Sequence, residues 1–150
     1  MGQEQLVATA LTIAREAHAG QVDKSGHAYI EHPVRVAKRV RRRDPDASAA
    51  VVAAALLHDV LEDTELTRAD LLARGIPVDV VDDVDAVTKR PGEPAEEYFA
   101  RVRARAGARA VKAADIEDNT DPERLALLDE STRRRLLAKY ERSLRLLEGE

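Results

Sequence analysis

The chain has 150 residues, no cysteine and a formal net charge of −4 at pH 7. This length suffices for one ordinary domain with a substantial hydrophobic core, and we expect a single domain over residues 1–150. The absence of cysteine excludes disulfides and thiolate metal sites, and the negative charge argues against general nucleic-acid binding.

The composition favours closely packed helices. Aromatic residues make up only 3% of the chain, whereas hydrophobic residues make up 44%, so Ala, Val and Leu must fill the interior. No apolar run reaches the roughly 18 residues of a membrane span, and the first residues have no apolar segment of the signal-peptide type. We therefore expect a cytoplasmic protein without membrane contact. No surface patch in the sequence indicates an oligomeric state.

The first amphipathic helix is predicted over residues 5–19, with Gly20 as its C-terminal cap. Its last turn holds His18, which we interpret as a helix-end or core histidine rather than a ligand. Residues 21–31 have no helical period and contain Lys24, Ser25 and Gly26, so they should form a loop.

A second helix is predicted to start at Pro33, because proline suits the first helical position. Core spacing continues to Val40, and the run 41–45 then ends the helix. His32 therefore stands at a helix entrance, with its backbone restricted by the following proline. Both a capping role and a metal-ligand role fit this position.

Residues 47–61 are almost entirely Ala, Val and Leu until four ionisable residues arrive at the end of this predicted helix. A continuous helix would place His58 above Glu62 and Asp59 above Asp63, since each pair is four residues apart. Three carboxylates would then face one another and the negative end of the helix dipole, and a bound cation would offset both effects. The alternative is a solvated acidic helix end.

The segment after this helix predicts two further short helices. Thr67 and Asp70 resemble a capping box, and that helix should close at Gly75. Helical spacing then places four valines on one face, with four aspartates outside them. The aspartates fit a solvated surface, with a second acidic metal site as the alternative. The valines are Val80, Val81, Val84 and Val87, and the aspartates are Asp79, Asp82, Asp83 and Asp85.

Three helices are predicted in the last third, over residues 96–106, 108–119 and 131–147, with a break at Gly107. The middle one places Asp115 directly after an apolar run, either as an ordinary helix end or as a metal ligand. No segment alternates as a strand would, so the chain reads as all-α. The last helix should bury Leu136, Leu137, Tyr140, Leu144 and Leu147.

A basic stretch fits either a solvated face or phosphate binding, and consists of Arg101, Arg103, Arg105 and Arg109.

His32, His58, Asp59 and Asp115 form an ordered H…HD…D set, with each member near a predicted helix end. With its flanking residues, this set resembles the HD-domain metal-dependent phosphohydrolases, and within them the hydrolase domain of RelA/SpoT-type alarmone enzymes and their small stand-alone relatives. The similarity runs in order from about residue 6 to residue 145. The matching flanks are residues 17–21, 24–26, 29–33, 54–64, 87–89 and 112–119.

The resemblance implies a compact helical HD-domain bundle that holds one Mn²⁺ and removes the 3′-pyrophosphate of ppGpp or pppGpp, leaving GDP or GTP. The residue types themselves suit Mn²⁺, Fe²⁺, Co²⁺ or Zn²⁺. The resemblance also implies functional residues. The metal ligands would be His32, His58, Asp59 and Asp115; the pair acting on water would be Glu62 and Asp63; and the substrate contacts would include Lys24, Ser25 and Asn119. From charge alone, Lys112 and Lys89 would screen the substrate phosphates.

Two departures from the family pattern bear on the substrate. Asp23 precedes Lys24 where the alarmone hydrolases commonly carry arginine, and Ile116 follows Asp115 where they carry another arginine. A missing guanidinium removes a cation that can stack on guanine. Two alternatives therefore stay open: a phosphohydrolase for a different nucleotide or phosphoester, and a nucleotide-binding module without turnover.

Overall fold

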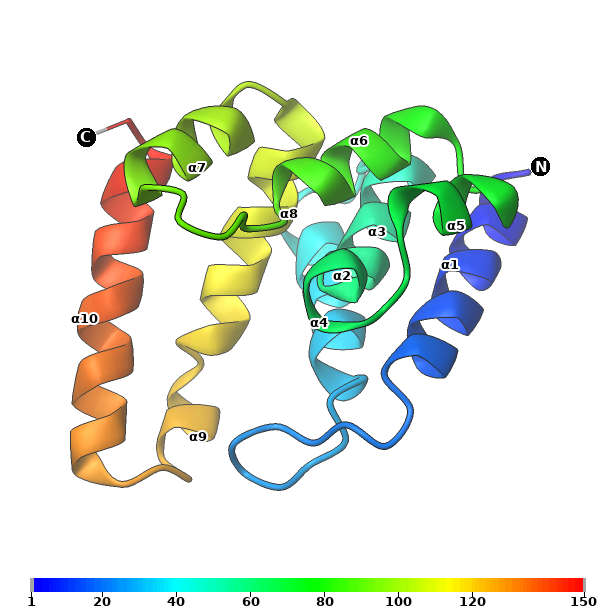
Figure 1. Cartoon of the computed structure of the whole chain (residues 1–150). Helices are drawn as coiled ribbons and strands as arrows, with labels where there is room; N and C mark the ends of the chain where they lie inside the picture. The colour runs from blue at the N-terminus through cyan, green and yellow to red at the C-terminus, as the bar shows by residue number, and fades with distance from the viewer. Residues whose placement is uncertain (1, 150) are drawn as a thin grey trace.

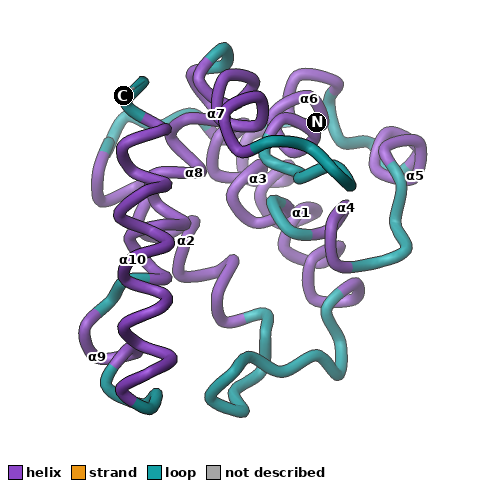
Figure 2. The backbone as a smooth tube through the Cα atoms, turned by 60° about the vertical axis from the view of Figure 1, so that its left-hand side comes forward, coloured by secondary structure: helices purple, strands orange, loops and turns teal. Residues whose placement is uncertain are grey.

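The computed structural model describes residues 2–149, and over this range the chain is built from helices, with one isolated β-bridge between Val22 and Ala28 (Figures 1 and 2). The all-α prediction is confirmed. Within the described residues, no helix is long and apolar enough to cross a membrane. The helices are α1 (Gln3–Ala17), α2 (Glu31–Arg43), α3 (Ala49–Leu57), α4 (Val60–Asp63), α5 (Arg68–Ala73), α6 (Val78–Ala86), α7 (Ala95–Arg103), α8 (Ala106–Asn119), α9 (Pro122–Leu125) and α10 (Glu130–Leu147).

Helix α3 is the centre of the larger hydrophobic core. Ser48 caps it by accepting a hydrogen bond from the Val51 amide, and every residue from Val52 to Leu57 is buried. Because α3 is built mainly from Ala and Val, α1, α2, α6 and α8 can all approach it closely (Figure 1). This packing holds the C-terminal end of α3 firmly, and the histidine of the candidate site follows directly there.

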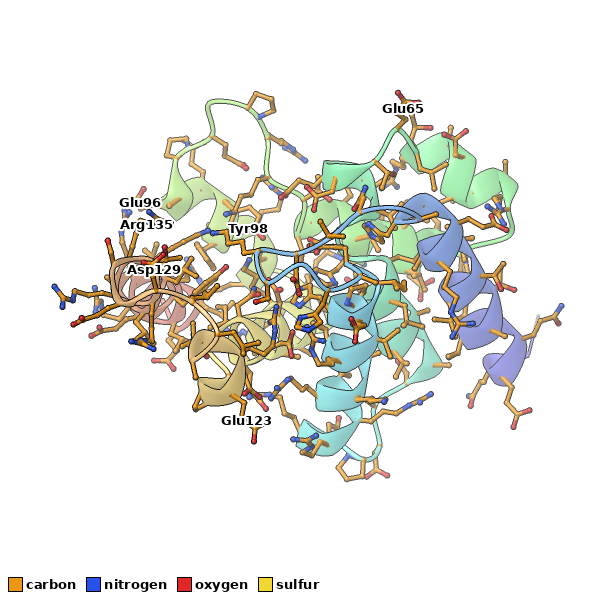
Figure 3. The ribbon with its side chains drawn as sticks, turned by 90° about the horizontal axis from the view of Figure 1, so that it is seen from below. Glu65, Glu96, Tyr98, Glu123, Asp129 and Arg135 are labelled. Carbon is orange, nitrogen blue, oxygen red and sulfur yellow. The ribbon has the colours of Figure 1, made fainter. Side chains whose placement is uncertain are left out.

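A second, smaller core joins α7, α8 and α10 around the edge-to-face pair of Tyr98 and Phe99. In Figure 1, α10 stands apart from α1 and α3, with α8 between them. Charged side chains such as Glu65, Glu123 and Arg135 project from the outside of the molecule (Figure 3).

The continuous helix predicted over residues 47–61 is wrong, because α3 ends at Leu57 and His58 and Asp59 form a turn before α4. The His58 ring explains the break. Its Nδ1 atom lies 2.7 Å from the Ala55 carbonyl oxygen, the acceptor that the Asp59 amide would use in a regular helix. Helix α2 also begins earlier than predicted, at Glu31, so Pro33 is its third residue, where no amide hydrogen is needed.

Gly107 does not break the chain but lies in the first turn of α8. A Cβ atom there would meet Asp83 Oδ2 at 2.1 Å, so glycine allows the Asp83 carboxylate to approach the helix. Asp83 is therefore buried beside Arg105 and does not belong to a solvated face. His18 forms a core hydrogen bond, as predicted, with its Nδ1 2.8 Å from Gln21 Oε1.

The C-terminal region differs from prediction in two respects. The short helix α9 was not predicted, and it begins where Asp121 accepts a hydrogen bond from the Glu123 amide. Leu137 and Leu144 are exposed, although the sequence predicts them to be buried. Among the described helices, α7 and α8 are the main packing partners of α10. They cover a narrower face of α10 than the sequence predicts, so Leu137 and Leu144 lie outside it.

Candidate metal centre

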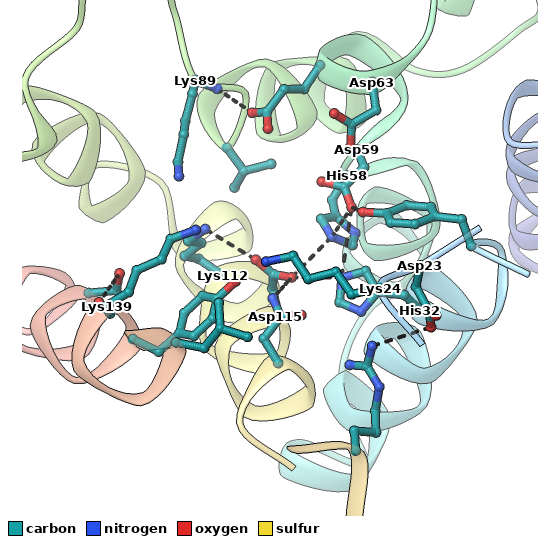
Figure 4. Close-up of a pocket in the computed structure, with 18 of the residues that line it drawn as sticks. Asp23, Lys24, His32, His58, Asp59, Asp63, Lys89, Lys112, Asp115 and Lys139 are labelled. Carbon is teal, nitrogen blue, oxygen red and sulfur yellow. Dashed lines mark hydrogen bonds and ion pairs between the residues drawn. The ribbon is translucent and has the colours of Figure 1, made fainter. Parts of the chain in front are cut away.

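A cavity of about 500 Å³ lies where α2, the α3–α4 turn, α8 and α10 meet (Figure 4). All of the site residues predicted from the sequence line it, although they come from five separate parts of the chain. They are Lys24, Ser25, His32, His58, Asp59, Glu62, Asp63, Lys112, Asp115 and Asn119. The structure therefore brings the whole predicted set to one place.

Two imidazoles and two carboxylates meet at the bottom of this cavity. Asp115 Oδ1 lies 2.9 Å from His32 Nε2 and 3.4 Å from His58 Nε2. Asp59 Oδ2 lies 3.1 Å from His58 Nε2 and 3.8 Å from His32 Nε2. One donor atom from each of His32, His58 and Asp115 lies within 4.8 Å of the others, which is the spacing that ligands around one ion require.

The His58 ring tests whether these residues fit a metal ion. Its Nε2 is buried and has no hydrogen-bond partner among the described residues, although two carboxylates face it. Burial by itself would lower the His58 pKa, but Asp59 and Asp115 raise it well above the ordinary value. The two carboxylates therefore favour a positive charge at His58 Nε2. A divalent cation bound there would supply this charge in place of a proton.

Both carboxylates are held in the ionised form that ligates metals. Burial would raise the pKa of Asp59, but His58 outweighs it, and the pKa falls to about 2. Burial acts in the same direction on Asp115, whose pKa is nevertheless well below its usual range because Lys112 and the two histidines oppose it. Lys112 Nζ lies 3.2 Å from Asp115 Oδ2, and Asn119 Nδ2 donates to Asp115 Oδ1 over 3.0 Å. This group of residues therefore has the chemistry to hold a divalent metal.

Glu62 and Asp63, the acidic pair, form a second group with Asp59, separate from the group of His32, His58 and Asp115. Donor atoms of Asp59, Glu62 and Asp63 lie within 4.8 Å of one another, because the turn at His58 separates α4 from α3. Glu62 Oε1 accepts the Lys89 amide over 2.8 Å (Figure 4). Partial burial and the charges of Asp59 and Glu62 raise the pKa of Asp63 to about 6. Asp63 is therefore a stronger base than an ordinary aspartate, while Glu62 is anchored to the loop after α6.

Four lysines form a wall of the cavity, and one of them, Lys112, pairs with Asp115. Lys24, Lys89, Lys112 and Lys139 come from four different segments and enter the same space (Figure 4). Across residues 2–149, no carboxylate lies within 4.0 Å of the ammonium groups of Lys24, Lys89 or Lys139. Burial and the charges of Lys89 and Lys112 lower the pKa of Lys139. This wall therefore carries positive charge that suits an anionic ligand.

The basic stretch of Arg101, Arg103, Arg105 and Arg109 lies outside this wall and does not contribute to this cavity. Arg101 pairs with Glu93, Arg103 donates to the Leu146 carbonyl oxygen over 2.5 Å, and Arg105 pairs with Asp83. None of the four arginines lines the cavity. Three of them hold the second core together.

Sequence reasoning missed several residues of the site. Tyr29 donates a hydrogen bond from its hydroxyl to Asp59, and its ring lies 5.0 Å from that of His18. Lys139 and Tyr140 reach the cavity from α10, and Arg124 reaches it from α9. The motif around His32 offered a signal for Tyr29, which lies three residues before it. Nothing local distinguishes Lys139 from the other basic residues of α10.

A model of the HD domain matches residues 10–141 of this chain. Among similar proteins, the guanosine-3′,5′-bis(diphosphate) 3′-pyrophosphohydrolase of Haemophilus influenzae is 47% identical over 77 residues, which are 51% of this chain and 11% of that protein. The corresponding protein of Vibrio cholerae is 44% identical over 77 residues, 51% of this chain and 10% of that protein. This chain thus spans about a tenth of the length of these curated relatives.

A solved structure described as "A metazoan ortholog of SpoT hydrolyzes ppGpp and plays a role in starvation responses" has a TM-score of 0.79 to this fold. The alignment covers 96% of this chain and 86% of that one, at 24% sequence identity. At this identity the likeness establishes a shared fold. Almost the whole described helical arrangement, α10 included, is therefore common to both.

Proposed function

Because this chain belongs to the HD-domain family, we propose that it is a metal-dependent hydrolase that removes the 3′-pyrophosphate of ppGpp, pppGpp or a related nucleotide, leaving GDP or GTP. One observation carries the proposal: two histidines and two aspartates share a single cavity with four lysines, of which Lys24, Lys89 and Lys139 have no carboxylate partner among residues 2–149. The names of the relatives support the choice of substrate. A polyphosphate seated between a cation and lysines would satisfy both sides.

The metal would be held by His32, His58, Asp59 and Asp115, and Mn²⁺ is our choice among the ions that this nitrogen and oxygen set suits. When bound, such an ion polarises the phosphoryl group and lowers the pKa of the attacking water. The carboxylates lie between two histidines, Lys112 and Tyr29, so their positions are fixed before substrate arrives. The protein would thus supply a rigid centre rather than one assembled on binding.

Asp63 would accept the proton of the attacking water, since its pKa, raised to about 6, makes it a stronger base than an ordinary aspartate. The oxygen of that water would bond to the phosphorus next to the ribose while the bond from this phosphorus to the 3′ oxygen breaks. Pyrophosphate would leave, and the 3′ oxygen would take up a proton from solvent to become the hydroxyl of GDP or GTP. Glu62 would orient the water while it stays bonded to the Lys89 amide. Lys24, Lys89, Lys112 and Lys139 would hold the phosphates.

A second candidate function keeps the metal and changes the nucleotide, and Asp23 favours it. Asp23 Oδ1 accepts the Ser25 and His27 amides over 2.8 and 3.0 Å, which fixes the loop beside the cavity. Asp23 Oδ2 lies 3.7 Å from Arg124 Nη2. The loop of residues 21–31, which would contact the base, therefore presents a carboxylate paired with an arginine of α9. The alarmone hydrolases commonly carry an arginine in this loop instead.

The test is pyrophosphate release from ppGpp with Mn²⁺, with GTP and an adenosine analogue alongside. We expect release from ppGpp, loss of at least a hundredfold in His58→Ala, and no change in His27→Ala, whose exposed side chain lies in the same loop region but outside the cavity. Release from another nucleotide only would favour the second candidate. Binding of ppGpp without any product would instead indicate a nucleotide-binding module and overturn the enzymatic proposal.

A further inference from the structure

Asp118 is a completely buried carboxylate that lies behind the metal centre and outside the cavity lining. Its Oδ2 atom lies 2.6 Å from His32 Nδ1, the ring nitrogen that faces away from the candidate metal position. The opposite nitrogen, Nε2, lies 2.9 Å from Asp115 Oδ1. The His32 ring is therefore held between two carboxylates, one on the cavity side and one on the protein side.

Three arginines hold Asp118 in place. Arg35 and Arg39 donate from their Nε atoms to Asp118 Oδ1 over 2.9 and 3.1 Å. They lie on the same face of α2 as His32, three and seven residues after it. Arg124 of α9 donates from Nη1 to Asp118 Oδ2 over 2.9 Å. Both carboxylate oxygens are thus fully engaged, and the buried negative charge is compensated on several sides.

We propose that Asp118 is a positioning residue that fixes the orientation and the proton of His32 for metal binding. A carboxylate can only accept hydrogen bonds, so Nδ1 must carry the proton of the neutral ring, and the lone pair then lies on Nε2, toward Asp115. The inference rests on the ligand role proposed for His32. Carboxylates that accept from a ligating histidine fix its ring and raise its basicity.

The two histidines of the site are held differently, which makes the inference testable at His32 alone. The Nδ1 atom of His58 bonds to the Ala55 backbone carbonyl, which no substitution removes. Asp118 is a side chain, and asparagine preserves its shape while replacing one acceptor oxygen by a donor. Asp121 offers a matched control, because it also pairs with Arg39, over 2.6 Å, but forms no hydrogen bond or ion pair with His32 in the part of the chain that the structure describes.

The experiment measures Mn²⁺ affinity of the full chain by competition with a fluorescent chelator, together with the rise in Tm that saturating Mn²⁺ produces. We expect about 10- to 100-fold weaker binding in Asp118→Asn, a correspondingly smaller rise in Tm, and wild-type values in Asp121→Asn. His32→Ala should bind weakest. Because both readouts concern metal binding, they do not depend on which nucleotide is hydrolysed.

Asp118→Asn with wild-type affinity, beside a strongly weakened His32→Ala, would overturn the positioning role and leave the metal site intact. Wild-type affinity in both variants would instead contradict His32 as a ligand, which is a failure of the proposed function. If circular dichroism shows that Asp118→Asn is unfolded, Arg124→Gln replaces it, since this arginine is partly exposed and provides one of the clamps. About fivefold weaker binding is then expected, and unchanged affinity would overturn the proposal.

Discussion

His58 Nε2 lies 3.1 Å from Asp59 Oδ2, so two consecutive residues direct their side chains to one point. Consecutive residues of a regular helix point about 100° apart, which would separate these groups. The turn between α3 and α4 removes that constraint, and the bond from the His58 ring to the Ala55 carbonyl stabilises the turn. The local irregularity of the backbone is thus what brings the His58 and Asp59 side chains together.

Removing the metal should lower the thermal stability of the protein. Without a cation, a buried carboxylate, a partly buried one and two buried histidines share one small volume. Binding of a ligand to the folded state alone stabilises that state. At a Mn²⁺ concentration about 100 times Kd, the stabilisation is about 2.7 kcal/mol. Differential scanning calorimetry with and without EDTA measures it. His58→Ala should be insensitive to EDTA and His27→Ala as sensitive as the wild type; equal responses in both variants would contradict the site.

Turnover should fall as the pH is lowered through about 6. The pKa of Asp63 is raised to about 6, so its carboxylate is ionised and able to accept a proton above that pH and is protonated below it. The pH profile of kcat/KM for pyrophosphate release measures this limb. Asp63→Asn should lose most activity at every pH, with no such limb in what remains. A wild-type profile that is flat between pH 5 and 7 would exclude Asp63 as the base.

The raised pKa of Asp63 also affects the stability of the fold: lowering the pH should reduce activity but remove a destabilising charge. Because the folded-state pKa of Asp63 exceeds the ordinary value of 3.8, ionised Asp63 disfavours the folded state, and protonation relieves this as the pH falls from 6 to 4. In EDTA, Asp63→Asn should therefore have a higher Tm than the wild type at pH 7.5, with the difference shrinking toward pH 4. Urea unfolding at both pH values provides the check, and a difference that grows on acidification would refute the assignment.

Lys139 should contribute to substrate binding more than to chemistry. It lies in the lysine wall of the cavity and has no carboxylate within 4.0 Å among residues 2–149. A charged hydrogen bond to phosphate contributes about 1.5–3 kcal/mol to binding. Lys139→Ala should raise KM about tenfold with little change in kcat. Lys38→Ala, an exposed lysine of α2 outside the cavity, is the control. An unchanged KM in Lys139→Ala would remove this residue from the phosphate wall.

Gly107→Ala should destabilise the fold. The added Cβ would lie 2.1 Å from Asp83 Oδ2, so the buried pair of Asp83 and Arg105 would have to move. Overpacking of this kind costs about 1–3 kcal/mol, measurable as a lower midpoint in urea. Gly2→Ala is the matched control, since nothing lies within 4 Å of its added Cβ. Equal midpoints for both variants would show that Asp83 relaxes without cost.

The sequence by itself determined most of the helices and the histidines and carboxylates of the candidate site. Spacing at three and four residues depends on contacts within a turn or two, so it predicts α1, α5 and α8 to within a few residues. The ordered histidines and aspartates could be recognised because their order along the chain does not depend on packing. Whether each carries its predicted role stays a prediction.

Only the tertiary structure decided how those residues meet. Asp118 lies 86 positions after His32, and its three arginines come from two other helices, so no local pattern could pair them. Lys139 and the burial of Asp83 depend likewise on where α10 and α8 pack. The physical reason is the same in each case: a charged side chain is placed by partners far away in sequence, and those partners are near only after the hydrophobic cores have formed.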